Sequence, residues 1–94
     1  MEKSIDISVV VPLYNEVESL PELVAWIDRV ARKNSLSYEI IMVDDGSTDG
    51  SWAVVEALKE QYSAIRGLSF MRNYGKSAAL YAGFDMARGE VVFT

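Results

Sequence analysis

Residues 40–49 read Ile-Ile-Met-Val-Asp-Asp-Gly-Ser-Thr-Asp, and this stretch decides the fold. Its first half, preceded by Glu39, is a short apolar run with β-branched residues, which is typical of a strand buried on both faces of a sheet. Its second half brings two carboxylates, a glycine and small polar residues, a combination that ends a strand and opens a helix. In open parallel α/β sheets, ligands bind outside the carboxyl ends of the strands. We therefore expect a ligand beside Asp44 and Asp45.

Only one of these two carboxylates is expected to face a cleft, because successive strand residues point to opposite faces of a sheet. We assign the cleft to Asp45, with Val43 on the same side. The rival interpretation is that the stretch from Asp44 to Ser47 only forms a turn and caps a helix, since Asp, Gly and Ser favour turns for local reasons.

The composition of the chain narrows its class. The 94 residues carry a net charge of −5 at pH 7, with 50% hydrophobic and 24% charged residues, as expected for one small soluble domain. The chain has no cysteine and no histidine, which excludes disulfides, thiolate metal sites and imidazole chemistry. The acidic balance argues against nucleic acid as a partner, because such a surface needs a basic stripe. No apolar run reaches the roughly 18–20 residues of a membrane span and no secretory signal is present, so we expect a cytoplasmic protein.

Strands and helices are expected to alternate along the whole chain. Hydrophobic periodicity predicts strands at residues 5–13, 38–44, 66–71 and 90–94, and helices at residues 20–33, about 50–62 and 77–88. Ser19 and Glu22 form a capping-box pattern at the start of the first helix, and Gly89 is placed to end the last helix. The alternation β-α-β-α-β-α-β predicts a three-layer α/β/α fold with a mostly parallel, Rossmann-like sheet and right-handed crossovers.

Two common phosphate-binding motifs are absent. The loop after the first strand contains no glycine, so the dinucleotide fingerprint Gly-x-Gly-x-x-Gly is missing. Gly75-Lys76-Ser77 imitates the end of a P-loop, but the glycine required five residues earlier is replaced by Phe70. Three polar clusters remain, all at one edge of the predicted sheet: Pro12-x-Tyr14-Asn15-Glu16, Asp44-Asp45-Gly46-Ser47 and Arg72-Asn73-x-Gly75-Lys76.

These clusters suit a nucleotide laid across the strand ends. A carboxylate only accepts hydrogen bonds, so Asp45 would pair with a base that presents a ring N–H, namely uracil or guanine, and would repel adenine and cytosine. Tyr14 offers a flat face for stacking, and Glu16 offers an acceptor for ribose hydroxyls. Lys76, beside Gly75 at a helix start, offers a diphosphate an ammonium group, backbone donors and the positive end of a helix dipole.

Each of these side chains also has a plain structural interpretation. Taken singly, Tyr14 is a surface aromatic, Glu16 a solvated loop acid and Lys76 an exposed lysine of a first helical turn. Asp49 is most economically a helix cap, and Trp26, which lies off the apolar stripe of the first helix, is a candidate for packing at an interface. The binding interpretation is favoured because all three clusters follow successive strands at the same sheet edge.

Together the clusters resemble the amino-terminal half of the inverting family 2 glycosyltransferases with the GT-A fold. The motifs that carry this resemblance are Val11-Pro12-Leu13-Tyr14-Asn15-Glu16, Val43-Asp44-Asp45-Gly46-Ser47-Thr48-Asp49 and Arg72-Asn73-Tyr74-Gly75-Lys76-Ser77-Ala78-Ala79-Leu80. Within the family, the chain looks most like the dolichyl- or undecaprenyl-phosphate sugar transferases. The resemblance covers essentially all of residues 1–94, which would be a single truncated nucleotide-sugar-binding domain.

The resemblance implies which residues bind the donor. The base and ribose pocket, with a diphosphate site at its lysine, would be lined by Pro12, Tyr14, Glu16, Val43, Asp45 and Lys76. The family also holds a divalent metal, Mg or Mn, with an Asp-x-Asp pair directly after the strand that begins at Glu90, and uses a catalytic base further on. Neither lies within these 94 residues. By this resemblance we expect the fragment to be inactive and the metal to be bound only by the full-length protein.

The expected function is therefore that of the nucleotide-binding half of an enzyme. It would transfer a sugar from a UDP- or GDP-linked donor to a polyprenyl phosphate, in a parent protein that is cytoplasmic or membrane-associated. The alternative is a non-catalytic nucleotide-binding module or a self-assembling α/β piece. The family's strand order, 3-2-1-4, would leave residues 90–94 as an unpaired apolar edge, so we also expect a homo-oligomer formed through that edge.

Overall fold

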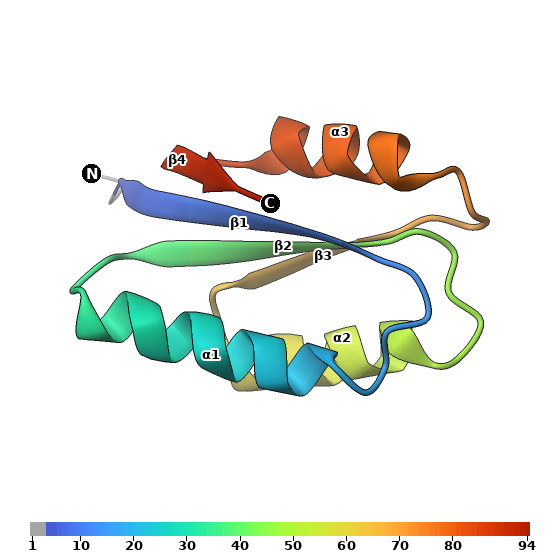
Figure 1. Ribbon diagram of the computed structural model, residues 1–94, viewed down its shortest axis with the longest axis horizontal. Coiled ribbons are helices and arrows are strands. Elements are labelled where there is room, and N and C mark those ends of the chain that lie inside the picture. The colour runs from blue at the N-terminus through green and yellow to red at the C-terminus, as the bar shows by residue number, and fades with distance from the viewer. Residues whose placement is uncertain (1–3) are drawn as a thin grey trace.

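Within residues 4–94, which the computed structural model describes, four parallel strands form a middle layer with helices on both faces (Figure 1). The elements in chain order are β1 (Ile5–Leu13), α1 (Leu20–Lys33), β2 (Tyr38–Asp44), α2 (Ser51–Gln61), β3 (Ile65–Ser69), α3 (Lys76–Met86) and β4 (Gly89–Phe93). The strand order is β3-β2-β1-β4. This confirms the predicted α/β/α fold and the predicted 3-2-1-4 order.

The register of the strands brings three loops to one edge of the sheet. Leu13, the last residue of β1, pairs with Asp44, the last residue of β2. Asp44 in turn pairs with Ser69, the last residue of β3. The three strands therefore end level with one another, and the segments that follow them start side by side.

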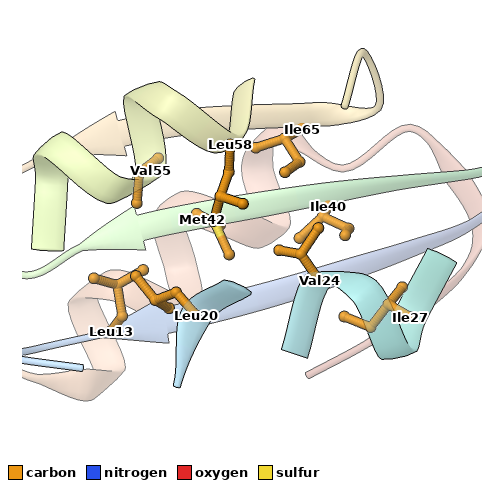
Figure 2. Close-up of a cluster of buried hydrophobic side chains, with 9 residues drawn as sticks. All are labelled: Leu13, Leu20, Val24, Ile27, Ile40, Met42, Val55, Leu58 and Ile65. Carbon is orange, nitrogen blue, oxygen red and sulfur yellow. The ribbon is translucent and has the colours of Figure 1, made fainter. Parts of the chain in front are cut away.

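The two faces of the sheet are covered by different helices. Helices α1 and α2 lie on one side, and α3 lies on the other (Figure 1). The α1 and α2 side holds the larger apolar cluster, which Figure 2 shows as sticks and which consists of Leu13, Leu20, Val24, Ile27, Ile40, Met42, Val55, Leu58 and Ile65. The α3 side holds a smaller cluster of Val10, Ile41, Val43 and Ala79. Strand β2 supplies both clusters in alternation, as a strand buried on both faces must.

Helix α3 approaches β1 very closely. A side chain added at Gly83 would place its Cβ 2.2 Å from Cγ1 of Val10, far closer than two non-bonded carbon atoms can approach. Glycine is therefore required at this helical position, although it weakens the intrinsic helix propensity. The close contact lets the second half of α3 pack directly on the middle of β1.

A buried polar network ties the strands together near their amino ends. The carboxylate of Glu39, which is 3% exposed, accepts hydrogen bonds from the Ser8 hydroxyl at 2.6 Å, the Arg88 N–H at 2.6 Å and the Arg66 guanidinium at 2.9 Å. The Ser8 hydroxyl oxygen also accepts a bond from the Gly89 N–H at 2.7 Å. Burial by itself raises the pKa of Glu39, but these hydrogen bonds and the charge of Arg66 outweigh it and hold the pKa below its ordinary value.

Two predicted helix ends are wrong. Ser19 makes no side-chain capping bond, because its backbone is already helical (φ −90°, ψ −17°) and its hydroxyl donates instead to the carbonyl and carboxylate oxygens of Glu16, each at 3.2 Å. Helix α3 ends at Met86, before the extended Ala87, and Gly89 instead begins β4. A Cβ at Gly89 would lie 2.6 Å from the Ser8 nitrogen, so close strand packing, and not a helix cap, explains this glycine.

Candidate functional site

A cavity of about 230 Å³ opens at the carboxyl ends of β1 and β2. It is lined by Pro12, Leu13, Tyr14, Glu16, Asp45 and Lys76. These residues come from the end of β1 and its loop, the loop after β2, and the first residue of α3. The structure thus brings together all but one of the predicted site residues, and adds Leu13.

Val43 is the predicted site residue that does not reach the cavity. Its side chain is 0% exposed and packs with Val10, Ile41 and Ala79 in the cluster beneath α3. Val43 and Asp45 do lie on the same side of the sheet, as strand alternation requires. Val43 does not line the cavity, because α3 covers that face of the sheet as far as the end of β2.

Asp45 lines the cavity and is only 4% exposed. Its carboxylate accepts hydrogen bonds from the backbone N–H of Tyr74 at 2.7 Å, the backbone N–H of Gly75 at 3.0 Å and the side-chain amide of Asn73 at 3.1 Å. The Gly75 N–H also lies 3.3 Å from the other carboxylate oxygen, so donors of residues 73–75 contact both oxygens of Asp45. Asp45 therefore anchors the loop before α3, a role that the sequence analysis missed.

Gly46, the next residue, lets the loops after β2 and β3 touch. Its backbone is left-handed (φ +80°), and an added Cβ would lie 2.4 Å from the carbonyl carbon of Arg72 and 2.6 Å from the nitrogen of Asn73. Only glycine satisfies both requirements without displacing backbone. The guanidinium of Arg72 does not line the cavity but lies over the ring of Tyr74, 5.0 Å from its centre.

Asp44 shapes the turn after β2, which is the structural role that the rival interpretation of this stretch gave it. Its side chain is 1% exposed, and its carboxylate accepts a hydrogen bond from the Ser47 N–H, three residues on, at 2.8 Å, which stabilises the turn. Its carbonyl oxygen accepts a bond from the Phe70 N–H at 2.8 Å. Of the two neighbouring acids, one shapes the turn and the other reaches the cavity.

Tyr14, Glu16 and Lys76 leave their polar or aromatic groups accessible at the cavity. All three are exposed, with 46% of Tyr14 open to solvent. Lys76 is the first residue of α3, and it follows Gly75, whose positive φ of 104° turns the chain into the helix. An ammonium group and the free N–H groups of a helix start are thus found together, which is an arrangement that attracts anions.

Asp49 lies one residue before the N-cap of α2 and bonds to the first residue of the helix, so the prediction that it is the helix cap itself is wrong. Its carboxylate accepts bonds from the N–H of Ser51 at 3.0 Å and from the Ser51 hydroxyl at 2.5 Å. The N-cap position itself is taken by Gly50, with φ +90°. The bond from the Ser51 hydroxyl, aided by backbone N–H groups, holds the pKa of Asp49 below its ordinary value, against the opposing effect of burial.

Residues 4–94 show neither a group of side chains placed to bind a metal nor a helix that could span a membrane. No group of three or more His, Cys, Asp and Glu side chains within that range is arranged to hold a metal ion. None of the helices in that range has the length and the apolar sequence needed to cross a membrane.

Comparison with known proteins places this geometry in a family. The model of glycosyl transferase family 2 matches residues 8–94. Undecaprenyl-phosphate 4-deoxy-4-formamido-L-arabinose transferase from Pseudomonas fluorescens (strain SBW25) is 46% identical over 89 residues, which are 94% of this chain and 26% of that protein. The transferase of the same name from Aeromonas hydrophila subsp. hydrophila is 43% identical over 89 residues, 94% of this chain and 27% of that protein.

Solved structures agree with the family match. A mannosyltransferase from Pyrobaculum calidifontis, in complex with GDP-Man and Mn²⁺, aligns with a TM-score of 0.80 at 29% identity, over 96% of this chain and 26% of that chain. TarS (residues 1–349) from S. aureus, in complex with UDP, aligns with a TM-score of 0.74 at 27% identity, over 96% of this chain and 27% of that chain. This chain thus spans about a quarter of the length of the proteins that it matches. It belongs to glycosyl transferase family 2 and has the strand order and helices of the GT-A fold.

Proposed function

We propose that this chain forms the nucleotide-binding part of a glycosyltransferase whose donor is a UDP- or GDP-linked sugar. The observation that carries the proposal is the cavity in which Tyr14, Glu16, Asp45 and Lys76 meet from three separate segments. Two structural neighbours support it, because one holds GDP-Man and the other holds UDP. Uracil and guanine both present a ring N–H to a carboxylate acceptor.

The size of the cavity suggests which parts of a nucleotide lie inside it and which lie outside. Pockets that enclose a whole drug-sized ligand measure about 300–1,000 Å³, and this one measures about 230 Å³. The base and ribose would therefore enter it, with the base against Tyr14 and the ribose hydroxyls donating to Glu16. The diphosphate would lie at its mouth over Lys76 and the first turn of α3, where positive charge offsets that of the phosphates.

Asp45 would read the base with a carboxylate whose two oxygens already accept hydrogen bonds from residues 73–75, so a base N–H would share an oxygen with one of these donors. Anchoring by residues 73–75 fixes the orientation of this carboxylate. It also makes the base-reading atom rigid before the ligand arrives, which lowers the entropic cost of binding.

Proposals about the acceptor, the metal and the cellular location concern a longer protein, because this chain spans about a quarter of the length of its relatives. Because those relatives are named for undecaprenyl phosphate, we propose a polyprenyl phosphate as acceptor and a parent enzyme that works on the cytoplasmic side of a membrane or on its surface. We also propose that a divalent ion, Mg or Mn, is held by residues of that longer protein, because one structural neighbour holds Mn²⁺ together with GDP-Man. No catalytic residue is assigned here, and we expect these 94 residues alone to bind a donor without turning it over.

Calorimetric titration of UDP, GDP, ADP and CDP tests the base preference. We expect UDP or GDP to bind at least about tenfold more tightly than ADP and CDP, a difference of about 1.4 kcal/mol that is typical of one buried hydrogen bond. Equal affinity for all four nucleotides, or a preference for ADP, would refute the role of Asp45.

Replacing Lys76 with alanine tests the placement of the diphosphate. Lys76 is exposed and serves no packing role, so the variant should fold normally. We expect Lys76→Ala to weaken UDP binding about three- to tenfold and to leave uridine binding unchanged, because uridine carries no phosphate. Lys59→Ala, which removes a surface lysine of α2 beside Glu56, is the matched control. Equal losses for UDP and uridine would contradict the placement.

A second proposal concerns self-association. Strand β4 ends the sheet among the described residues, and Val91, Val92 and Phe93 are 50%, 40% and 54% exposed. We propose that a second copy of the chain pairs with this edge in antiparallel fashion, which a two-fold axis normal to the sheet permits. Analytical ultracentrifugation should show a concentration-dependent dimer that Val92→Lys abolishes. A monomer at high concentration would contradict the proposal.

A further inference from the structure

The loop after β1 is held by the loop after β2 through its backbone. The N–H groups of residues 15, 16 and 17 donate in turn to the Ser47 hydroxyl at 2.8 Å, the Ser51 hydroxyl at 3.1 Å and the Asp49 carboxylate at 3.4 Å. Three consecutive backbone donors of one loop are thus satisfied by side chains of another. Ser47, Asp49 and Ser51 therefore do more than shape a turn and start a helix.

One side chain of the first loop completes the connection in the other direction. The amide oxygen of Asn15 accepts a hydrogen bond from the Thr48 N–H at 2.9 Å. Together with the bond from the Asn15 N–H to Ser47, it forms a pair of opposed bonds between the two loops. We call this pair of bonds the loop latch.

The backbone at Asn15 shows why an asparagine occupies this position. Its φ of +54° is left-handed, a conformation that asparagine tolerates better than most residues other than glycine. The turn lies between Tyr14 and Glu16, both of which line the cavity, whereas Asn15 itself does not. Asn15 therefore lies between two cavity-lining residues without lining the cavity itself.

The far end of the contact is rigid. Ser51 is 0% exposed at the first residue of α2, and its hydroxyl donates to Asp49 while its oxygen accepts the Glu16 N–H. A buried hydroxyl with both partners in place has little freedom to rotate. The loop after β1 is consequently fastened to the helix layer at one end and to the latch at the other.

We infer that Asn15 is a positioning residue which, through the latch with Ser47 and Thr48, holds Tyr14 and Glu16 in the geometry that binds the nucleoside. The inference rests on the proposed function. When the latch is open, the loop spends only part of its time in the binding conformation, and the apparent dissociation constant rises as that fraction falls. The latch acts on the nucleoside part of the ligand and not on the diphosphate part, which lies at Lys76.

The test uses two variants that open the latch from opposite sides. Asn15→Gly removes the acceptor for Thr48 but keeps a residue that adopts φ +54° without strain, and Ser47→Ala removes the acceptor for the Asn15 N–H. Asn34→Ala is the matched control, because Asn34 makes a comparable side-chain bond to the Val30 carbonyl, 2.8 Å long, at the end of α1. Circular dichroism establishes that each variant is folded.

Two quantities are measured for each variant: the affinity for UDP and for uridine, and the exchange rate of the amides of residues 15–17 and 48 by NMR. We expect each latch variant to weaken both ligands by a similar factor, about five- to tenfold, and to exchange these amides faster. Because both variants open the same latch, the double variant should lose less than the product of the two single losses. Asn34→Ala should match the parent chain in every measurement.

A rescue variant separates positioning from general weakening of the loop. Asn15→Asp keeps an acceptor oxygen and tolerates the left-handed backbone, so it should bind UDP within about twofold of the parent chain at roughly 0.5 M salt, where the added charge is screened. Failure of this rescue would overturn the assignment of the effect to the Thr48 bond.

The remaining outcomes distinguish this inference from the function on which it rests. If the parent chain binds neither UDP nor GDP, the proposed function is wrong and the positioning role falls with it. If the parent chain binds but the latch variants bind equally well, the inference alone is overturned. Unchanged amide exchange in Asn15→Gly would refute the latch itself, whether or not any nucleotide binds.

Discussion

Replacing Glu39 with glutamine should destabilise the fold without touching the nucleotide cavity. The carboxylate accepts three hydrogen bonds, from Ser8, Arg66 and the backbone of Arg88, and lies at the amino ends of the strands. Glutamine has nearly the same shape but only one acceptor oxygen, and its NH₂ group must face at least one of these donors. The variant also removes the negative charge that pairs with Arg66.

The expected loss of stability follows from how deeply Glu39 and Arg66 are buried. Breaking a fully buried ion pair costs about 3–5 kcal/mol. Glu39 is 3% exposed, but the Arg66 side chain is 30% exposed, so water solvates part of the charge that is left behind. We therefore expect Glu39→Gln to lower the free energy of unfolding by about 2–4 kcal/mol. A domain of this size has roughly 5–14 kcal/mol in all, so the loss is a large share.

Urea unfolding followed by the fluorescence of Trp26 and Trp52 measures the effect at pH 7. The midpoint should fall while the slope m stays unchanged, because the native surface is not altered. Glu56→Gln is the control: Glu56 forms a surface pair with Lys59 at 3.7 Å, and its loss should cost less than about 0.5 kcal/mol. A loss below about 1 kcal/mol for Glu39→Gln would refute the reasoning.

The same variant should alter the dependence of stability on pH. The pKa of Glu39 is lowered in the folded state, so the folded protein binds the proton less readily than the unfolded chain. The stabilisation is present in full above the unfolded pKa, about 4.3, and is lost as the pH falls through the lower, folded pKa. The stability difference between the parent chain and Glu39→Gln should therefore shrink below about pH 4 and stay constant from about pH 6 to 8. A difference that grows on acidification would contradict the sign of the shift.

Three further substitutions test contacts described above. Asp45→Ala should lower the free energy of unfolding by about 2–3 kcal/mol, because three donors lose a charged acceptor, and hydrogen exchange should show the loop before α3 opening first; protection equal to that of the parent would refute the anchoring role. Gly46→Ala should cost more than 2 kcal/mol by thermal unfolding, whereas Gly50→Ala, which is also left-handed but has open space around it, should cost about 1 kcal/mol. Gly83→Ala should cost about 1–3 kcal/mol, and Val10→Ala in the same chain should relieve part of it, while additive losses would contradict the predicted clash.

The fold could be predicted from local pattern alone because each strand and helix carries its own hydrophobic period. Residues 38–44 are apolar on both faces, and the structure buries them between α3 and the α1 and α2 layer. The same pattern assigns Val43 and Asp45 to one side of the sheet but does not reveal how far α3 extends over that side. Exposure depends on a helix that lies more than thirty positions later in the chain.

The sequence predicted most of the residues that gather at the cavity but not the hydrogen bonds that hold them in place. Tyr14, Glu16 and Lys76 follow from their places after strands, which a single sequence shows. The donors that occupy Asp45 come from residues 29 and 30 positions away, and no local rule pairs an acid with those particular amides. The failed cap at Ser19 has a similar cause, since two favourable side chains for a capping box say nothing about the backbone angle that decides whether it forms.

Because its strands are parallel, the sheet joins segments that are far apart in the sequence, and this affects how late in folding the cavity forms. Hydrogen bonds that hold its walls join residues 32 positions apart between the first two loops and 29 positions apart between the second and third. Contacts of such span form late, because a long loop must close before any of them yields energy. A nucleotide would thus bind the native protein, in which the sheet is complete, and not partly folded states. Added UDP or GDP would consequently slow global unfolding while leaving the initial refolding rate unchanged.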